Sequence, residues 1–198
     1  MKALNIKYSL MFFCFMLLYN TGKAQKFSYL KPQYAVTQHA GSIGYISIGA
    51  GYELFKDNSG SLELLYGMVP ESKGGPLHIL TAKFAYHPFE IKVKNNIKFY
   101  PANPGLFFSY HLGEQFDLAF DQDQYGKSYY GWSTALRGHF SLSNEIKINT
   151  GKKLKSLSLY SEFNVSDLYL ASIFYRNNRE WLSPSDITKL GIGVKVGF

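Results

Sequence analysis

The sequence predicts an all-β fold, an eight-stranded antiparallel transmembrane β-barrel. Three observations lead to this prediction: an N-terminus of the export type, repeated short segments in which apolar and polar residues alternate, and polar faces that combine charges of both signs with glycine and serine. Alternation matters because successive side chains of a strand point to opposite faces of a sheet. Aromatic residues make up 17% of the chain and gather towards segment ends, as the interfacial girdles of a membrane barrel require.

Residues 1–24 are predicted to be a signal peptide. Two lysines give a basic start, an apolar run of ten residues follows at 10–19, and the small residues Gly22 and Ala24 precede a cleavage site at Gln25. A membrane-spanning helix needs about 20 apolar residues, roughly twice the length of this run. The pattern therefore favours a cleaved leader over a helical anchor.

Removing residues 1–24 changes the composition of the remaining domain, predicted to be 25–198. Three lysines leave, so the formal net charge falls from +7 to +4, and Cys14, the one cysteine, leaves with them. The domain is therefore expected to have no disulfide and no cysteine metal ligand. Its modest positive charge accompanies no nucleic-acid motif, which argues against a nucleic-acid partner.

Eight segments of the domain show the alternation expected of strands. In 189–198, for example, Leu190, Ile192 and Val194 share one face, and glycines and lysines share the other. In 168–175 both faces are apolar, so the pattern is ambiguous there. Clusters of glycine, proline, asparagine and aspartate separate the segments, with no convincing amphipathic helix between them. The predicted strands are 43–55, 61–69, 77–88, one that ends in 105–113, 129–142, 154–164, 168–175 and 189–198.

Three stretches of the domain fit more than one structure. Residues 26–39 could be a lead-in to the barrel or an early strand, and residues 90–100 (EIKVKNNIKFY) could be a strand extension or a basic loop. The stretch 114–127 is long and acidic, but it lacks the glycine and terminal glutamate of a calcium loop. We expect a solvated loop there. Since no metal-ligand spacing, phosphate loop or dinucleotide motif is evident, we expect neither a metal nor a cofactor.

The charged residues of these segments indicate which face meets lipid. An alternating all-β chain can bury its apolar face in a soluble core or turn it towards lipid, and the alternation is the same in both cases. Here the polar faces hold four cations and three anions, which nearly cancel, as a narrow lumen of paired charges requires. Trp132, Ile192 and Val194 are then expected to face hydrocarbon. The expected lumen charges are Glu53, Glu63, Lys83, Arg137, Glu162, Lys189 and Lys195.

The strand number also suits a barrel that spans a membrane. Most segments reach the roughly 9 to 11 residues that a tilted membrane strand needs, and an even number of strands returns both ends of the domain to the same side. Side chains just fill the interior of an eight-stranded barrel. We therefore expect this barrel not to conduct bulk solutes.

The C-terminal stretch LGIGVKVGF alternates apolar residues up to a terminal aromatic residue. It resembles the C-terminal assembly signal of small Gram-negative outer-membrane β-barrels. The resemblance implies a place in the outer membrane, contact with outer-membrane lipid and lipopolysaccharide, and recognition by the barrel-assembly machinery during biogenesis. The expected assembly signal comprises Leu190, Ile192, Val194, Val196 and Phe198.

A histidine and a serine two residues apart, His139 and Ser141, share one face of a predicted strand. The pair resembles the His-x-Ser pair of the outer-membrane lipid A 3-O-deacylases, which use it with a more distant glutamate. That resemblance implies Ser141 as nucleophile, His139 as base, and Glu162 or Glu145 as the orienting acid. In the alternative interpretation both residues are hydrogen-bonding partners inside the lumen, and Arg137 on the same face favours it.

Together these observations favour an outer-membrane barrel with a packed polar lumen, a structural or surface-binding role and an unidentified ligand. Two alternatives stay open: a lipid A-modifying hydrolase of the outer leaflet, and a soluble periplasmic barrel that binds an apolar ligand. Two clusters of lysines beside strand ends are natural counter-ions for lipopolysaccharide phosphates wherever they lie at the outer surface. They comprise Lys92, Lys94 and Lys98, and Lys147, Lys152, Lys153 and Lys155.

Overall fold

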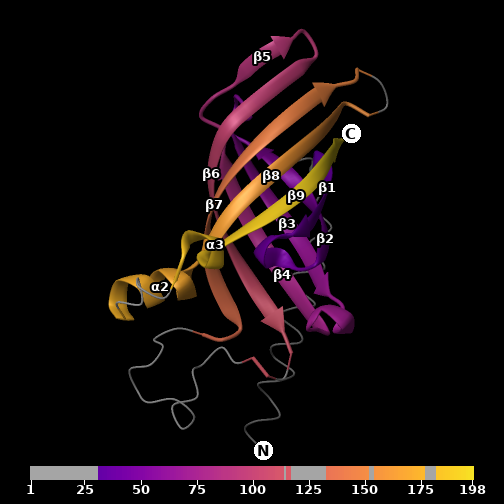
Figure 1. The fold of residues 1–198 in the computed structure, drawn as a ribbon. Coiled ribbons are helices and arrows are strands. Elements are labelled where there is room, and N and C mark those ends of the chain that lie inside the picture. The colour runs from indigo at the N-terminus through magenta and orange to yellow at the C-terminus, as the bar shows by residue number, and fades with distance from the viewer. Residues whose placement is uncertain (1–30, 114, 117–132, 152–153, 177–181) are drawn as a thin grey trace, which may run out of the picture. The chain divides into compact units, whose positions relative to one another are not determined.

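A computed structural model describes residues 31–113, 115–116, 133–151, 154–176 and 182–198 of the chain. The predicted signal peptide, most of the stretch 114–127 and Trp132 lie outside these residues. Within them, nine strands form one sheet, and all except β5 close into an eight-stranded antiparallel barrel (Figure 1). The barrel strands are β1 (Tyr34–Ala40), β2 (Ile46–Leu54), β3 (Gly60–Val69), β4 (Leu77–Tyr86), β6 (Ile97–Leu112), β7 (Leu136–Asn149), β8 (Ser156–Ser166) and β9 (Thr188–Gly197).

The barrel follows the order of the chain. Each strand pairs with the next, except that β4 pairs with β6, and β9 closes the barrel on β1. β5 (Ile91–Lys94) pairs with the first residues of β6, and the two form a hairpin that extends beyond the barrel wall (Figure 1). No helix in the described ranges is long and apolar enough to cross a bilayer. The connections contain η2 (Gly41–Ile43), η3 (Glu71–Lys73), α2 (Asp167–Arg176) and α3 (Pro184–Ile187).

The two ends of the barrel differ in their connections. The backbone N–H of Phe198 donates to the carbonyl of Gln33 at 3.1 Å, so the start of the first strand and the end of the last meet at one rim, here called the terminal rim. Connections 55–59, 87–96 and 150–155 belong to this rim. The opposite rim, here called the loop rim, holds two longer connections. Its connections are 41–45, 70–76, 113–135 and 167–187.

Apolar side chains cover the outside of the barrel. Ile192 is 52% exposed, whereas Glu162 on the adjacent strand is 2% exposed and faces the lumen. The prediction of an outward apolar face is thus confirmed for the described residues of the predicted strands that form, whereas β1, which is not among them, turns Tyr34 and Val36 inward. We call the exposed apolar strand residues the outer belt. It comprises Ile46, Ile48, Leu64, Tyr66, Met68, Leu80, Tyr86, Leu106, Phe108, Leu112, Phe140, Leu142, Ile146, Ile148, Leu157, Leu159, Phe163, Leu190 and Ile192.

Most of the charges predicted for the lumen are inside the barrel. Glu53 and Arg137 are half-buried near strand ends. The prediction for Lys189 is wrong: this side chain is exposed at the loop rim, where its Nζ donates to the carbonyl of Asp186 at 3.1 Å. The pairing of β1 with β9 reaches only to Gly191, so Lys189 lies beyond the closed wall. Of the predicted charges, those that form ion pairs with one another in the lumen are Glu63, Lys83, Glu162 and Lys195.

The number of barrel strands is as predicted, but one member of the set differs. The predicted strand at 168–175 is wrong, because this segment forms helix α2. The strand that replaces it is β1, which lies in the open stretch 26–39, while residues 90–100 form the β5–β6 hairpin and are thus a strand extension. The predicted strand at 129–142 is shifted, since β7 begins at Leu136 and ends at Asn149.

Glycines on the inward face make room for two tyrosines in the lumen. A Cβ atom at Gly51 would overlap the ring of Tyr34, and one at Gly193 would overlap the ring of Tyr160. Each ring therefore lies directly against a strand backbone, which only glycine permits at such close approach. On β9 this packing accounts for Gly193, whereas the other inward glycines lie against Gln38 and Ser156.

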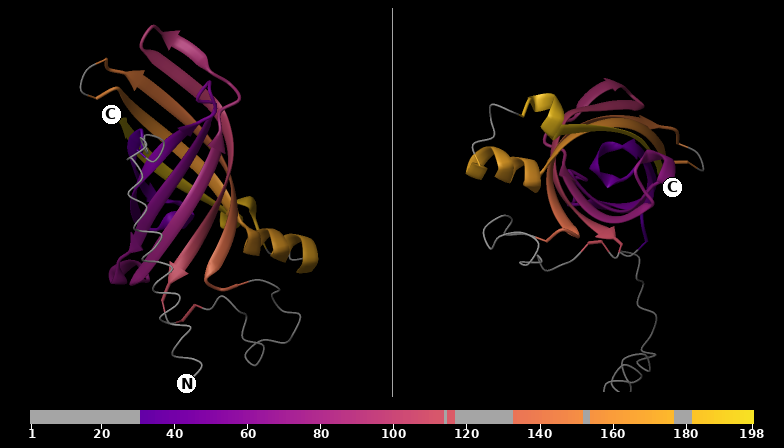
Figure 2. Two further views of the ribbon diagram at one scale, coloured as in Figure 1. Left: turned by 180° about the vertical axis from the view of Figure 1, so that it is seen from behind. Right: turned by 60° about the horizontal axis from the view of Figure 1, so that its bottom comes forward.

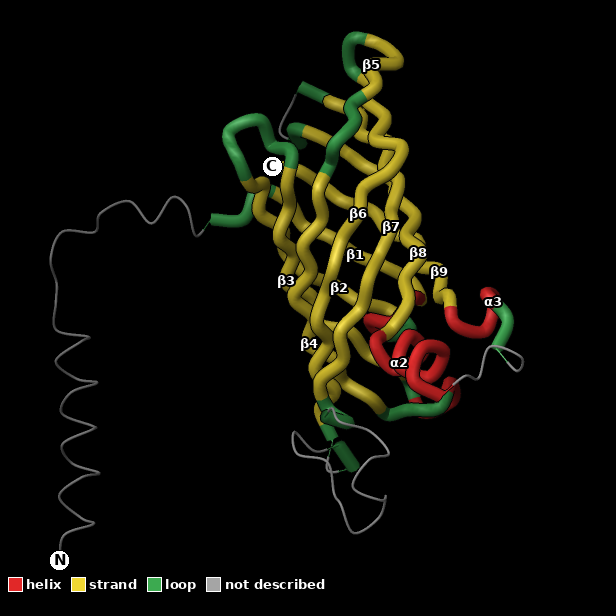
Figure 3. The backbone as a smooth tube through the Cα atoms, turned by 90° about the vertical axis from the view of Figure 1, so that its left-hand side faces the viewer, coloured by secondary structure: helices red, strands yellow, loops and turns green. Residues whose placement is uncertain are grey.

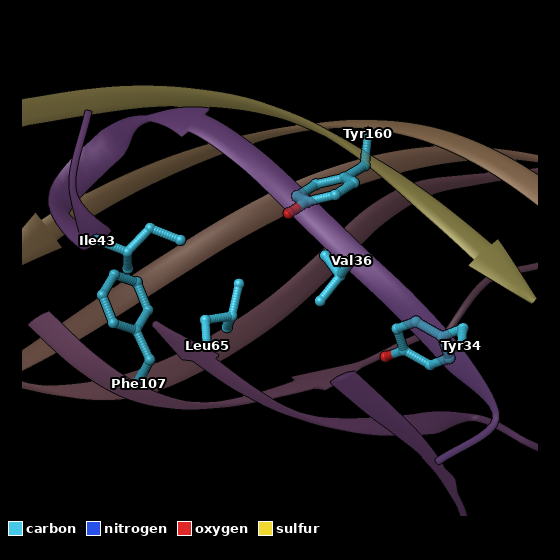
Figure 4. Close-up of a cluster of buried hydrophobic side chains, with 6 residues drawn as sticks. All are labelled: Tyr34, Val36, Ile43, Leu65, Phe107 and Tyr160. Atoms are coloured by element: carbon cyan, nitrogen blue, oxygen red, sulfur yellow. The ribbon is translucent and has the colours of Figure 1, made fainter. Parts of the chain in front are cut away.

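The β1–β2 connection folds into the barrel and fills its loop-rim end (Figure 2, right). Ile43 of η2 is completely buried and belongs to an apolar cluster with Leu65 and Phe107 (Figure 4). The hydroxyl of Ser42 donates to Oδ1 of Asn164 at 2.5 Å, which ties the connection to β8. We call residues 41–45 the plug, because they separate the middle of the lumen from the loop rim.

Candidate functional site

Lys83 lies in the middle of the lumen. β4 turns this side chain inward, and its Nζ lies 3.1 Å from Oε2 of Glu63 and 3.2 Å from Oε2 of Glu162. The same Nζ donates to Oε1 of Gln38 at 3.2 Å. Because the acceptors come from β3, β8 and β1, one ammonium group links strands on several sides of the barrel.

Lys195 forms a second centre nearer the terminal rim. Its Nζ, on β9, lies 2.9 Å from Oε1 of Glu63 and 2.9 Å from Oε2 of Glu145. Glu63 therefore bridges the two ammonium groups. We call Lys83, Lys195 and the glutamates Glu63, Glu145 and Glu162 the lumen network. It holds two cations and three anions.

Two tyrosines support the lumen network. Tyr34 donates through Oη to Oε1 of Glu63 at 3.0 Å, and Tyr160 donates to Oε1 of Gln38 at 2.8 Å. Nζ of Lys195 lies 4.8 Å from the ring centroid of Tyr160 and 5.5 Å from that of Tyr34. These hydroxyls and ring faces replace part of the hydration that the charges lose on burial. In the lumen network, the burial of each charge is therefore stabilised by its ion-pair and hydrogen-bond partners.

A cavity of about 320 Å³ opens from the terminal rim towards Lys195. Two ion pairs line it, Lys98 with Glu90 at 2.9 Å and Lys147 with Glu53 at 2.8 Å. The hydrogen bond from Lys98 holds the pKa of Glu90, which lies in the β4–β5 connection, below its ordinary value. Such a lining suits water or a small polar solute. It does not suit the apolar ligand of the soluble-barrel alternative.

The structure does not assemble the predicted hydrolase pair. His139 is buried, and its Nε2 lies 2.9 Å from Oγ of Ser109 instead of bonding to Ser141. The imidazole ring stacks on Phe107, with the ring centroids 4.3 Å apart. Ser141 and His139 share the inward side of β7, as predicted, but a nucleophile and its base must be in hydrogen-bond contact.

Both glutamates considered as the orienting acid are bound to lysines. Glu162 pairs with Lys83, and Glu145 pairs with Lys195. In the described part of the chain, Nδ1 of His139, the atom that an orienting acid must reach, has no hydrogen-bond partner. The arrangement therefore matches hydrogen bonding within the lumen, the alternative interpretation of this pair.

The residues of the expected assembly signal form an apolar strip along β9. Leu190 and Ile192 belong to the outer belt, Val194 and Val196 are half-exposed, and Phe198 is exposed just after the strand. The strip lies at the seam where β9 meets β1. Its role in assembly stays a prediction.

Sequence reasoning missed part of the lumen network and its supports. Tyr34 and Gln38 belong to β1, which lies in the stretch 26–39 that the sequence leaves open between a lead-in and an early strand. The sequence analysis gives Glu145 only as a candidate orienting acid, although the period-two pattern of the predicted strand 129–142 continues through it. Asn144 interrupts the apolar face at this point, and its Nδ2 donates to Ser161 on the outer side of the wall at 3.0 Å. Following the polar face past Asn144 would have placed Glu145 in the lumen.

No group of three or more potential metal ligands occurs among the residues that the structure describes. No protein-family model matches the chain, and no curated protein matches it. Among solved structures, it is similar to a chain described by the words "De novo design of transmembrane beta-barrels", with 14% sequence identity and a TM-score of 0.40 over 85% of this chain and 98% of that one. The class follows from the molecule itself: a closed antiparallel barrel, apolar outside and charged inside, is a transmembrane-type β-barrel.

Proposed function

We propose that the chain is an integral outer-membrane protein whose barrel is closed to bulk solutes and whose role is structural or surface-binding. The inverted polarity of the wall carries this proposal, with Ile192 exposed outside and Glu162 buried inside. In water, so large an exposed apolar surface would be unfavourable. In lipid, the same wall is favourable, because the antiparallel pairing satisfies the strand backbones internally.

The outer membrane is proposed because single-chain barrels of this kind belong to it. The predicted signal peptide at 1–24 and the apolar strip that ends at Phe198 support export and recognition by the barrel-assembly machinery. In bacterial barrels, short turns face the periplasm and longer loops face outward. By this rule the terminal rim faces the periplasm, and the loop rim faces the cell surface.

The two rims then have different partners. In this proposal any surface-binding site, and any contact with lipopolysaccharide, lies at the loop rim, because the long connections 113–135 and 167–187 belong to it. The described lysines of the two basic clusters lie towards the terminal rim instead, for example Lys92 on β5 and Lys147 near the end of β7. In the proposed orientation these lysines face the periplasm and do not meet lipopolysaccharide phosphates.

Two layers close the lumen in this proposal. The plug fills the loop-rim end with Ile43, and the lumen network fills the middle with buried side chains such as Lys83. The cavity at the terminal rim leads inward to Lys195. An eight-stranded barrel has an interior that side chains just fill, so bulk solutes are not expected to pass.

Fractionation and heat-modifiability test the proposal. After expression in a Gram-negative host, the protein is expected in the outer-membrane fraction, and detergent should be needed to extract it. On an SDS gel it should migrate differently before and after boiling, because a closed barrel keeps its hydrogen-bonded wall until it is heated. A sample unfolded in urea marks the position of the unfolded chain. Release into the soluble periplasmic fraction without detergent would overturn the proposal.

The hydrolase alternative makes a separate prediction. Because His139 bonds to Ser109, the change Ser141→Ala is expected to leave lipid A acylation as in cells that express the unchanged protein, measured by mass spectrometry of extracted lipid A. The matched change Ser109→Ala removes the partner of a buried imidazole nitrogen and should destabilise the barrel by about 1–3 kcal/mol. Loss of an acyl chain that depends on Ser141 would contradict the structural interpretation of this pair.

A further inference from the structure

Helix α2 (Asp167–Arg176) lies on the outside of the barrel near the loop rim (Figures 1 and 3). Its main neighbours are β7 and β8. Its first residue lies against the outer face of β7, since a Cβ atom at Gly138 would be 3.9 Å from Cβ of Asp167. From there the helix runs sideways, away from the wall (Figure 2). Thus α2 neither extends the barrel nor covers its end.

Apolar residues occur on all sides of α2. In its sequence, DLYLASIFYR, only Asp167, Ser172 and Arg176 are strongly polar. A helix that is apolar all round is normally enclosed by protein or by lipid. Every residue from 167 to 173 is nevertheless half-buried rather than buried, so the described protein encloses this helix only in part. Part of its apolar surface is therefore left open to the surroundings of the barrel.

The outer belt reaches the base of α2. Phe140, two residues beyond Gly138 on β7, is 64% exposed, and Phe163 on β8 is 48% exposed. Leu190, the β9 partner of Phe163, extends the same surface. The apolar surface of α2 is therefore continuous with the surface that lipid covers in the proposed function.

We propose that α2 is an interfacial membrane anchor, which lies at the boundary between lipid headgroups and acyl chains beside the loop rim. This inference rests on the proposed membrane function. A short apolar helix that runs sideways from the wall can lie in the plane of that boundary and immerse its side chains in lipid. The partner is thus the lipid surface itself, and not a second protein.

Tyr169 and Lys189 suit this position. Nζ of Lys189 lies 5.7 Å from the ring centroid of Tyr169, so an aromatic ring and a cation meet at the base of the helix. Aromatic rings concentrate at membrane interfaces, and lysine places its ammonium group among the headgroups while its stem stays in apolar surroundings. The pair marks the depth at which the loop rim leaves the bilayer.

Lipid-dependent quenching tests the anchor. In the full chain carrying Cys14→Ser, single cysteines are introduced by Ile173→Cys on α2, Ile48→Cys in the outer belt and Ser72→Cys in the exposed turn η3, and each is labelled with a fluorophore. The proteins are folded into phosphatidylcholine–phosphatidylglycerol vesicles with or without nitroxide-labelled lipid. Quenching at position 173 is expected to reach at least about half of that at position 48, with little quenching at position 72.

The outcomes separate the anchor from the proposed function. Quenching at position 48 without quenching at position 173 overturns the anchor and leaves the membrane barrel intact. Absence of quenching at both positions overturns the membrane barrel, and the anchor with it. Quenching at position 173 that disappears as the protein concentration rises, together with cross-linking between copies there, overturns the lipid partner in favour of a second copy.

A charged variant provides an independent readout. In this experiment the fluorophore is attached to a new single cysteine, Ala171→Cys. Adding the change Leu170→Asp should reduce lipid quenching at position 171 at least about twofold, because a carboxylate resists immersion in acyl chains. Ser72→Asp is the matched control and should leave quenching at position 171 unchanged. The heat-modifiability gel shows whether each variant has folded. Equal quenching in folded Leu170→Asp and folded control protein would overturn the anchor.

Discussion

Lys83→Met is expected to destabilise the barrel by about 3–5 kcal/mol, because it leaves Glu162 without its cation in the middle of the lumen. Methionine keeps most of the volume of the lysine stem, so the effect reports the missing charge more than a cavity. Glu63 keeps its ion pair with Lys195, which confines the unpaired charge to one carboxylate. Urea unfolding of the protein folded in lipid vesicles, followed on the heat-modifiability gel, measures the change.

Two control variants test whether the stability loss in Lys83→Met comes from the unpaired buried charge. Lys98→Met breaks the partly exposed ion pair with Glu90 at the terminal rim and should change stability by no more than about 1 kcal/mol. The double variant Lys83→Met with Glu162→Gln removes both charges and should recover part of the loss, since no unpaired carboxylate remains. If Lys83→Met costs no more than Lys98→Met, the lumen network does not stabilise the barrel as inferred here.

Gly67→Ala is expected to displace the plug. The added methyl group would overlap the carbonyl oxygen of Ile43, a backbone atom that cannot rotate away as a side chain can. The plug must therefore move, at an expected cost of about 1–3 kcal/mol. Urea unfolding measures this cost, and the displaced plug should also raise the frequency of conductance events in planar bilayers.

Gly138→Ala is the matched control for this substitution. Gly138 also lies within a strand, but the nearest atom to an added Cβ is a ring carbon of Phe108 at 3.6 Å, an ordinary contact. Stability and conductance should then stay close to those of the unchanged protein. Equal effects of the two substitutions would show that the plug is not held against Gly67.

The outward face of most strands could be predicted because lipid and lumen select opposite residue types. On β8, Leu157, Leu159 and Phe163 alternate with Ser158 and Glu162, so the period of two is plain. The sequence leaves β1 open as one of two alternatives for 26–39, because the pattern of this strand is reversed. It turns Tyr34 and Val36 into the lumen cluster and leaves Ala35, Thr37 and His39 outside. The outward face of this strand carries no row of large apolar residues, so alternation with an apolar outer face does not identify it as a membrane strand.

The prediction of a strand at 168–175 is wrong for a different physical reason. Residues that are apolar on both faces of a strand are also apolar on all sides of a helix, so periodicity alone does not separate the two. A local signal was present at Asp167, a residue type that favours helix starts, and its Oδ1 accepts a hydrogen bond from the backbone N–H of Leu168 at 2.7 Å. The predicted number of barrel strands still agrees with the structure, because the wrong strand at 168–175 and the absence of β1 from the eight predicted strands cancel.

The charges of the site could be predicted better than their pairing. Glu63, Lys83, Glu162 and Lys195 all lie on polar faces that the alternation identifies. Which carboxylate each lysine meets depends on strand register and barrel closure, and a lysine side chain has a long flexible stem. Sequence distance gives no guide here, since Lys195 contacts Glu63 from the other end of the chain.

That contact bears on how the protein reaches its final state. β9 is the last strand and β3 an early one, so Lys195 can meet Glu63 only when the sheet has curled and its two edges have joined. An open sheet in transit would present unneutralised carboxylates to acyl chains, at a cost of several kcal/mol for each. Insertion and edge joining should therefore occur together, and half-formed intermediates should be scarce inside the bilayer.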